Sequence, residues 1–191
     1  MPRLHPTPRE LEAARDRHVP DVIAPNLRIL FCGINPSLYS AAVGHHFARP
    51  GNRFWKTLHG SGFTPTLLRP DQERQLLRAG LGITNVVARA TASAAELIET
   101  DYREGADLLT HKLKHYHPRC IAFVGLGAYR LISNDPKARV GEQQPAFGGV
   151  KTWALPNPSG LNAHYQLDEL IRVYGQLARA AGDSAAPAGT D

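Results

Sequence analysis

The sequence predicts one α/β domain, a three-layer α/β/α sandwich whose central sheet is twisted, mostly parallel and four- to five-stranded. Two observations predict this fold class. Short apolar segments rich in β-branched residues alternate along the chain with longer segments in which apolar residues recur at helical spacing, a pattern that favours parallel strands joined by helices on both faces of a sheet. The 191 residues are 42% hydrophobic, enough for a single core, and contain no internal repeat.

Four segments are expected as strands because they are short, apolar and closed by turn residues. They comprise residues 27–33, 80–87, 119–124 and 150–155. Helices are expected where apolar residues recur at helical spacing and where a capping residue such as Thr7 precedes them. They comprise residues 8–17, 70–79, 101–117 and 164–181, a helix that carries Phe54, and a turn and helix over residues 125–133. Residues 37–53 and 134–149 are expected as loops, and residues 88–100 as a loop or short helix.

The ends of the chain and its composition limit the class of protein. Residues 1–20 are charged and proline-rich and are expected as a partly mobile arm, residues 21–181 as the single domain, and residues 182–191 as a disordered tail. The net charge of +5 favours polyanionic partners. No segment resembles a signal peptide or a membrane span, so we expect a cytoplasmic protein without membrane contact.

Cysteines and histidines give no reason to expect a disulfide, a metal or a cofactor. Cys32 and Cys120 each lie in an expected buried strand and are expected to be reduced core thiols. Two thiolates are too few for an iron–sulfur cluster. The pair His45 and His46 and the three histidines of residues 111–117 invite a metal interpretation, but histidines on a solvated surface are commoner.

Asn35 is the first candidate for chemistry because it follows the first expected strand. Pro36 disfavours helical geometry for the residue before it, so Asn35 is expected to stay extended at the carboxyl end of the strand. Ligands of open α/β sheets bind at this edge. A lone Asn-Pro pair more often forms an Asx turn, so the surrounding sequence decides between the two interpretations.

Two motifs resemble those of the mismatch-specific uracil and thymine DNA glycosylases, a branch of the uracil-DNA glycosylase superfamily. The first motif comprises Gly-Ile-Asn-Pro at residues 33–36, Gly-His-His-Phe at residues 44–47 and Pro-Gly-Asn-Arg-Phe-Trp-Lys at residues 50–56. The second is Asn-Pro-Ser-Gly-Leu-Asn at residues 157–162, after the last expected core strand. The resemblance covers residues 23–180, and two ungapped motifs in the right order make it specific.

The resemblance implies an enzyme that flips a uracil out of DNA and hydrolyses its bond to the sugar. Asn35 would be the catalytic residue; its amide oxygen can orient a water but cannot take up a proton, so a slow enzyme is expected. The residues implied in base binding are Ile34, Ser40, His46, Phe47, Asn85 and Thr91. Phe47 would stack on the base, although an isolated phenylalanine is more often a core anchor. Asn85 can equally bond to the backbone.

In the second motif the resemblance implies contacts inside the duplex. Leu161 would be the wedge that fills the place of the flipped base, the alternative being an apolar staple at the start of the last helix. Gly160 and Asn162 would meet the opposite guanine through their main chain. The family often has a basic residue just beyond, whereas this chain has Ala163, so a weaker grip on the opposite strand is expected.

Charged residues near the motifs give two further hypotheses. Candidates for contacts with phosphates are Arg49, Arg53, Lys56 and Lys151. Such charges are usually solvated surface. The acids closest in sequence to the expected site are Glu96, Glu99 and Asp101. One of these acids would supplement Asn35 as a base, and the alternative is that they cap helices or face solvent.

The resemblance thus implies a monofunctional DNA glycosylase in base excision repair. Water is the nucleophile because neither motif core contains a lysine. Its substrate would be uracil, with ethenocytosine and weakly thymine, opposite guanine in duplex DNA, and we expect a monomer without an obligate protein partner. Two alternatives stay open: a broad uracil-DNA glycosylase that also acts on U:A pairs and single strands, and a catalytically silent DNA-binding protein. A hydrolase that uses Cys32 and His46 is disfavoured because Cys32 lies inside an apolar strand.

Overall fold

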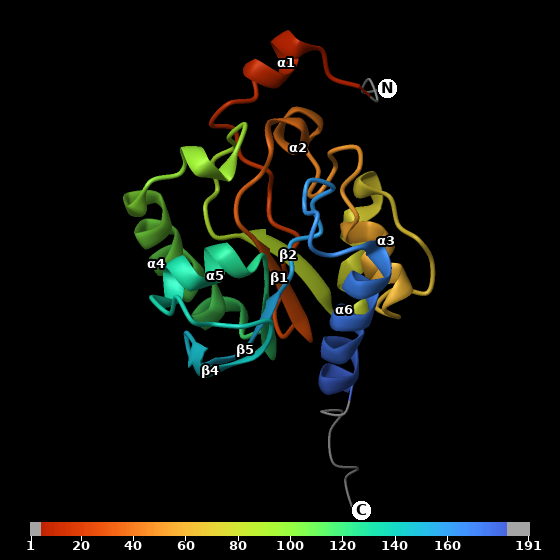
Figure 1. Cartoon of the computed structure of the whole chain (residues 1–191), viewed down its shortest axis with the longest axis vertical. Coiled ribbons are helices and arrows are strands. Elements are labelled where there is room, and N and C mark those ends of the chain that lie inside the picture. Colours follow the sequence, from red (N-terminus) through yellow and green to blue (C-terminus); the bar gives the residue numbers. More distant parts are fainter. Residues whose placement is uncertain (1–4, 183–191) are drawn as a thin grey trace, which may run out of the picture.

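A computed structural model of the protein describes residues 5–182, which form a five-stranded sheet covered by helices (Figure 1). The strands are β1 (Ile29–Gly33), β2 (Leu81–Asn85), β3 (Cys120–Val124), β4 (Gly141–Phe147) and β5 (Val150–Leu155). Their order in the sheet is β2-β1-β3-β5-β4, and all neighbours are parallel except β4 and β5. The predicted α/β class with a mostly parallel sheet is confirmed, and each parallel strand lies within a segment predicted as a strand.

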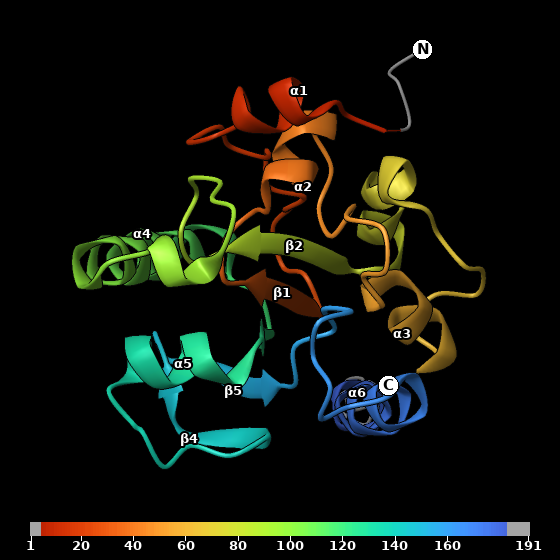
Figure 2. The same cartoon turned by 45° about the horizontal axis from the view of Figure 1, so that its top comes forward.

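Helices cover both faces of the sheet and the edge at which its parallel strands end. They are α1 (Pro8–Glu12), α2 (Leu38–Val43), α3 (Phe54–Gly60), α4 (Glu99–Tyr116), α5 (Leu126–Ser133) and α6 (Leu167–Gly182), with the 3-10 helices η1 (Pro70–Ala79) and η2 (Ala94–Glu96). One face is covered by α3, α6 and η1, and the other by α4 and α5 (Figures 1 and 2). The short helices α1 and α2 pack together beyond the carboxyl end of β1.

Alternate side chains of the central strand enter two cores, one on each face of the sheet. Ile29 and Phe31 of β1 lie in the core beneath α3 and α6, and Leu30 and Cys32 lie in the core beneath α4 and α5. All four are at most 1% exposed. Because both faces of β1 are buried, its sequence is apolar throughout instead of alternating with polar residues, which is how a parallel strand could be recognised.

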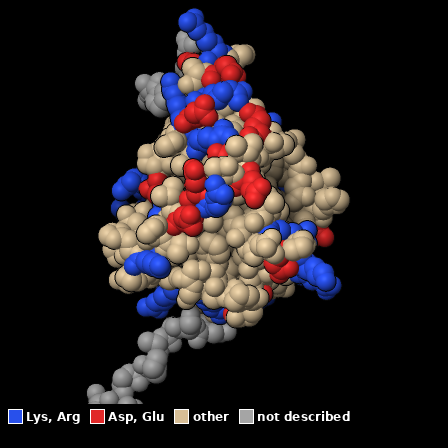
Figure 3. Space-filling view, turned by 90° about the vertical axis from the view of Figure 1, so that its left-hand side faces the viewer, with Lys and Arg blue, Asp and Glu red and all other residues tan. Residues whose placement is uncertain are grey.

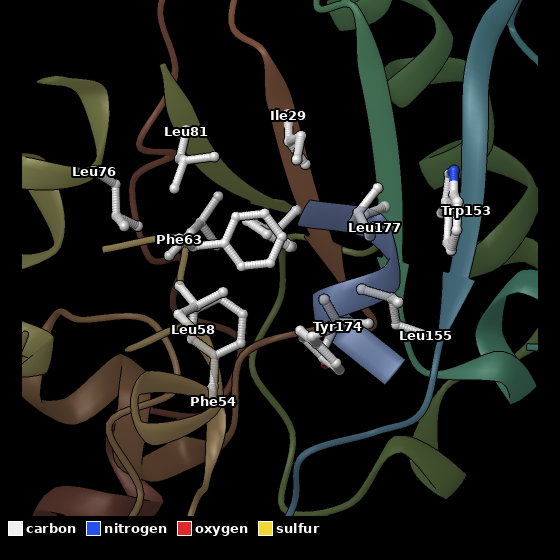
Figure 4. Packing of buried hydrophobic residues seen from close by; sticks show 14 of the residues in the cluster. Ile29, Phe54, Leu58, Phe63, Leu76, Leu81, Trp153, Leu155, Tyr174 and Leu177 are labelled. Carbon is white, nitrogen blue, oxygen red and sulfur yellow. The ribbon is translucent and has the colours of Figure 1, made fainter. Parts of the chain in front are cut away.

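Aromatic rings fill the core beneath α3 and α6 (Figure 4). Phe31 packs edge-to-face against Phe54 of α3, with ring centroids 5.7 Å apart, and against Phe63, at 5.3 Å. This arrangement brings the partly positive edge of one ring to the negative face of the next. The buried hydroxyl of Tyr174 donates to the carbonyl of Pro156, which ties α6 to the segment that follows β5.

The edge strand β4 was predicted as part of a surface loop, and this prediction was wrong. It forms an antiparallel hairpin with β5 through Gly148 and Gly149, which take left-handed φ values of 59° and 78°. Gln143 is its only buried residue. An edge strand that is exposed on most of its length needs no apolar pattern, and its Gly, Pro and Gln residues conceal it in the sequence.

Helix α2 was also missed, because residues 37–53 were expected as a loop. Ser37 caps its first turn by accepting from the backbone N–H of Ser40, and Gly44 ends it in a left-handed conformation with φ 77°. Six residues are too few for a recognisable apolar period. Smaller differences concern the ends of predicted helices: α6 begins at Leu167 instead of residue 164, and α1 ends at Glu12.

The described part of the predicted mobile arm is packed on the domain. Ala14 and Val19 are buried in a small third core with Ala41 of α2 and Ala90 of the loop after β2. Residues 6–12 contribute no buried residue, so the buried part of the contact is made by the segment that follows α1. The boundary predicted at residue 20 therefore does not separate the arm from the domain.

Residues 1–4 and 183–191 lie outside the described part of the chain, and the predicted disordered tail falls there except for Gly182. Over residues 5–182 no helix combines the length and apolar character needed to cross a bilayer. Cys32 and Cys120 are both buried free thiols. Burial raises the pKa of each thiol above its ordinary value, to about 12 for Cys120.

Candidate functional site

A half-open cavity of about 260 Å³ lies where the segments after β1, β2 and β5 converge at the carboxyl edge of the sheet. All seven residues predicted for catalysis and base binding line it, namely Ile34, Asn35, Ser40, His46, Phe47, Asn85 and Thr91. Among the described residues that line it, Arg49 is the only Lys or Arg, and none is Asp or Glu. The volume suits one planar ring and is small for a larger ligand.

The side-chain amide of Asn35 is held by two acceptors in the loop after β2. Its nitrogen Nδ2 donates to the carbonyl of Arg89 at 3.0 Å and to the hydroxyl of Thr91 at 2.8 Å. The Thr91 hydroxyl gives its own proton to the carbonyl of Ser93, so it acts as an acceptor toward Asn35. Both contacts require the NH₂ group, which fixes the amide against a flip. Oδ1 of Asn35 is therefore left for a ligand or water in the cavity.

A second amide is oriented through a buried histidine. Nε2 of His46 lies 3.0 Å from the carbonyl of Pro20, which can only accept, so Nε2 carries the ring proton. Nδ1 of His46 then accepts from Nδ2 of Asn85 at 3.4 Å. Burial lowers the pKa of His46, which favours the neutral ring that this arrangement needs. The contact with His46 leaves the amide oxygen of Asn85 as an acceptor.

Glu73 of η1 fixes the turn that carries the two histidines, a role that was not predicted. Glu73 is 6% exposed, and its carboxylate accepts from the backbone N–H of His46 at 2.8 Å and lies 3.0 Å from Nδ1 of His45. The next residue, Phe47, has a left-handed φ of 52°, which a phenylalanine rarely adopts without support. Nothing near Glu73 in the sequence could have indicated this contact, because 27 residues separate it from His46.

Phe47 serves both as a core anchor and as a wall of the cavity. Its ring stacks on Phe54, with centroids 3.9 Å apart and an interplanar angle of 22°, and it is half-buried. The absence of a side chain at Gly33 makes room for the neighbours of the ring. A Cβ at Gly33 would lie 2.5 Å from Oδ1 of Asn85 and 3.4 Å from the ring of Phe47. Phe47 can thus be a core anchor and still present its ring to the cavity.

Ser40 and Ile34 complete the side of the cavity formed by the first motif. Ser40 is buried, and its hydroxyl accepts from the N–H of Ala48 and from the hydroxyl of Ser37, each at 3.2 Å. The bond from Ala48 connects α2 to the turn that carries Phe47, and the bond from Ser37 lies within the first turn of α2. Ile34 is half-buried and lines the cavity directly after β1.

The three acids that were considered as a second base do not line the cavity. Glu96 pairs with Arg15 at 2.6 Å. Asp101 pairs with Arg89 at 2.7 Å and accepts from the N–H of Ile98 at the start of α4. The Arg89 guanidinium and this N–H lower the pKa of Asp101 to about 2. Glu99 is exposed on the first turn of α4. Of the two alternatives, capping describes Glu96 and Asp101, which are also ion-paired, and exposure to solvent describes Glu99.

Arg53, one of the candidates for contact with phosphate, joins the two motifs. Its guanidinium donates to backbone carbonyls of the segment after β5, those of Pro158, Ser159, Asn162 and Tyr165, at distances between 2.5 and 3.4 Å. The backbone N–H of Arg53 also donates to the carbonyl of Pro158, at 2.9 Å. Figure 1 shows the segment that leads into α3 and the segment after β5 side by side, above α3 and α6. The only sequence signal was the presence of Arg53 inside the first motif.

Leu161 lies at the tip of the second motif and is 78% exposed, beside the opening of the cavity that it lines. Helix α6 begins six residues later, so the alternative of a staple at the helix start does not apply. Gly160 lacks a side chain for a reason within the chain: a Cβ there would lie 2.6 Å from the carbonyl of Gly51 in the first motif. The backbones of the two motifs therefore meet directly behind Leu161.

Both main-chain groups of Asn162 are already hydrogen-bonded within the protein. Its N–H donates to the carbonyl of Ser159, and its carbonyl accepts from Arg53, both at 3.0 Å. Its side chain donates to the carbonyl of Asn157 at 2.9 Å. In the described chain the main chain of Gly160 makes no hydrogen bond, so of the two residues predicted to meet the opposite base it is the one whose main chain is available.

The remaining basic candidates occupy different places. Arg49 lines the cavity and is exposed, and Lys56 is exposed on α3. Lys151 lies near the start of β5, at the end of the strand away from the second motif, and its ammonium is 3.6 Å from Glu142 of β4. A contact of Lys151 with DNA bound at the cavity is therefore disfavoured by its position, whereas Arg49 is well placed for one.

The described residues include no group of three or more His, Cys, Asp or Glu side chains arranged to hold a metal ion. The alternative of a hydrolase that uses Cys32 is disfavoured as well. The thiol of Cys32 is 1% exposed and donates to the carbonyl of Gly33, and its pKa is raised by burial, so it is no nucleophile near neutral pH.

These features together define an α/β protein with a cavity, large enough for a small planar ring, at the carboxyl edge of its sheet. A sequence profile of the uracil DNA glycosylase superfamily matches residues 20–178, and the chain belongs to that superfamily. The solution NMR structure of a candidate uracil DNA glycosylase from Methanosarcina acetivorans has the same fold, with a TM-score of 0.61 at 20% identity over 87% of this chain and 98% of that one. The predicted superfamily is confirmed, and the mismatch-specific branch stays a prediction.

Proposed function

We propose that the protein is a monofunctional DNA glycosylase that hydrolyses the N-glycosidic bond of uracil opposite guanine in duplex DNA. Membership of the superfamily supports DNA as the partner and uracil as the base. The observation that carries the proposal is the fixed amide of Asn35, whose oxygen is left for a water in a cavity lined by the stacking residue Phe47. The proposed enzyme is a cytoplasmic monomer that needs no metal or cofactor.

In this mechanism Asn35 orients the attacking water. Its Oδ1 accepts a hydrogen bond from the water, which directs a lone pair of the water oxygen toward C1′ of the sugar. The C1′–N bond breaks and its electrons stay on the leaving base, while a C1′–O bond forms and the water proton passes to solvent. Because an amide cannot take that proton, bond breaking must run ahead of water attack, through an oxocarbenium-like sugar. This explains why a slow enzyme is expected.

Uracil is selected in the proposal by Asn85 and Phe47. Nδ2 of Asn85 is directed at His46, and so Oδ1 is the atom that can accept from a base. Uracil has an N3–H donor, whereas cytosine has a lone pair at N3 and would meet Oδ1 with repulsion. The Phe47 ring, which lines the cavity, supplies stacking for the flipped base. Ethenocytosine and thymine are larger than uracil, and both are included as substrates in the test of the proposal.

Leu161 is the proposed wedge. An exposed leucine beside the opening of the cavity can enter the base stack from which the nucleotide is extruded. Arg49 is the proposed contact for a phosphate of the flipped nucleotide, because it is the only Arg or Lys among the described residues that line the cavity.

One observation favours a second candidate, a uracil-DNA glycosylase that also acts on U:A pairs and on single strands. The main chain of Asn162 is occupied by Ser159 and Arg53, which leaves Gly160 alone to recognise a base opposite. Fewer contacts with the opposite guanine reduce the free-energy difference between a G and an A at that position.

The test is single-turnover release of free uracil from duplexes with U opposite G and U opposite A, with T and ethenocytosine opposite G as further substrates, and from single-stranded U. Asn35→Ala, purified in the same way, excludes a contaminating glycosylase. Fastest release from U opposite G supports the proposed enzyme, and equal rates on single strands support the second candidate. Binding of U:G duplex without release of any base would make the chain a catalytically silent DNA-binding protein and would overturn both.

A further inference from the structure

The loop that orients Asn35 is held in place from outside by the N-terminal segment. This loop, residues 88–97, supplies the Arg89 carbonyl and the Thr91 hydroxyl to the amide of Asn35. Backbone bonds to the first motif hold it at two points: Val87, just before the loop, donates to the carbonyl of Ile34 at 2.9 Å, and Thr91 donates to the carbonyl of Pro36 at 3.3 Å. Between these points the orientation of Asn35 depends also on what supports the loop from its other side.

Backbone bonds and a small core supply that support. The N–H of Asp16 donates to the carbonyl of Ala90 at 3.0 Å, and the N–H of Ala90 donates to the carbonyl of Arg17 at 2.9 Å. Ala90 is fully buried in the third core, beside Ala14 and Val19. Ala90 lies between the two residues that bond to Asn35, so a shift of the N-terminal segment would move both acceptors.

Ion pairs surround this contact. Arg89 donates to both carboxylate oxygens of Asp101, at 2.9 and 2.7 Å, and pairs with Asp16 at 3.3 Å. Arg15 pairs with Glu96 of the same loop at 2.6 Å. Acidic and basic side chains alternate over the upper part of the face seen in Figure 3, the part of the molecule where α1 lies. The side chain of Arg89 thus connects the N-terminal segment, the loop and the start of α4, while its carbonyl bonds to Asn35.

We propose that Arg89 and the N-terminal segment it pairs with are positioning elements for Asn35. They do not touch the substrate; they hold the two acceptors of the Asn35 amide at a fixed distance, so that its oxygen keeps one direction. Surface ion pairs contribute little to global stability, so their place around this loop points to a role in local geometry. The kinetic part of the proposal rests on the proposed glycosylase function.

The test is a double-mutant cycle between Arg89→Ala and Asn35→Ala in the full chain. In the otherwise wild-type protein, Arg89→Ala is expected to slow single-turnover release of uracil about tenfold, because small misplacements of an orienting group have large effects on rate. In the Asn35→Ala background it is expected to change the rate by less than about twofold, since the group that it positions is absent. Affinity for duplex DNA with an abasic site is expected to stay unchanged.

Arg69→Ala is the matched control, because Arg69 also pairs with a carboxylate, that of Asp71, but lies directly before η1 and outside the loop. Arg69→Ala should leave the rate of uracil release unchanged both in the wild type and in the Asn35→Ala background. Both variants are expected to melt within about 4 °C of the wild type. An equal slowing by Arg89→Ala in both backgrounds, or no slowing at all, would overturn the proposal.

Hydrogen exchange separates this proposal from the proposed function. The backbone amides of Ala90 and Thr91 are expected to exchange about tenfold faster in Arg89→Ala than in the wild type, with no change in Arg69→Ala. If the wild type releases no base, the glycosylase function fails while the exchange measurement still decides the positioning role. Unchanged exchange at both amides in Arg89→Ala would overturn it.

Discussion

The two motifs are held in place in different ways, although both contribute to one cavity. In the first, Asn35 is partly buried, its amide is fixed by two neutral acceptors, and the backbone around it continues the parallel ladder of β1 and β2. In the second, Leu161 is 78% exposed, and its loop is held from behind by the guanidinium of Arg53. A group that orients a water needs one fixed direction, whereas a wedge must stay exposed on a loop that resists being pushed back.

The charge of Arg53 is what holds the second motif, so its removal is expected to have the largest effect among the changes that leave the cavity intact. Arg53→Gln loses most of the bonds to four carbonyls and should lower the free energy of unfolding by about 2 kcal/mol. Release of uracil from duplex DNA should slow about thirtyfold, and release from single strands much less, because a single strand needs no wedge. Denaturant unfolding and the two single-turnover rates measure these effects.

Arg172→Gln is the control for this variant, because Arg172 is exposed on α6 and its side chain makes no hydrogen bond or ion pair with the described residues. Equal slowing of Arg53→Gln on duplex and single-stranded substrates would show that Arg53 supports the fold in general instead of the wedge loop.

Leu161→Ala separates the wedge from the loop that carries it. Because the side chain is exposed, its truncation should leave the melting temperature unchanged. Release of uracil from duplex DNA should slow about tenfold, because the wedge offsets a fraction of the few kcal/mol that extrusion of a base requires. Leu131→Ala, at an exposed leucine of α5, is the matched control. Unchanged duplex rates in Leu161→Ala would remove the wedge from the proposed mechanism.

Thr91→Val tests the first motif by removing one of the two acceptors of Asn35 while keeping the side-chain shape. The amide then keeps only the Arg89 carbonyl, and single-turnover release should slow about fivefold, as expected for the loss of one hydrogen bond. The slowing should be the same for duplex and single-stranded uracil, because this motif acts on chemistry and not on extrusion. A slowing confined to duplex DNA would contradict the division of roles between the motifs.

The buried His46 predicts a smaller effect, on pH dependence. Its pKa is lower in the folded protein than in the unfolded chain, so the unfolded chain binds the proton more readily. Its contribution to stability is therefore complete above about pH 6.5 and is lost as the pH falls toward the folded pKa. Thermal unfolding between pH 5 and 7 measures this slope, which His46→Gln should flatten, since glutamine keeps a donor and an acceptor but does not titrate.

Protonation of His46 should also reduce the release of uracil at low pH. A charged ring donates from both nitrogens and can no longer accept from Nδ2 of Asn85, so the amide of Asn85 would turn its oxygen to the ring and its NH₂ group to the base. A rate in the wild type that stays constant over the pH range in which unfolding shows His46 to be protonated in the folded protein would contradict the orientation assigned to Asn85.

The sequence was informative where burial imposes a pattern or where a motif is short and continuous. The parallel strands could be predicted because both of their faces are buried, and Asn35 because Pro36 restricts the residue before it. The contacts of Arg53, Glu73 and Arg89 could not be predicted, because they join segments far apart in the chain and leave no period in the sequence. The hydrogen-bond partners of such polar side chains are determined by the fold, which brings together residues that are distant in the sequence.

The central claim is that water, oriented by Asn35, is the nucleophile that releases uracil. The most direct measurement compares the wild type and Asn35→Ala for single-turnover release of free uracil from a U:G duplex, with borohydride added to a parallel sample to trap any imine between protein and sugar. We expect release that slows about a hundredfold or more in Asn35→Ala, and no trapped protein–DNA adduct. Equal release by both proteins, or a borohydride-trapped adduct, would contradict the claim.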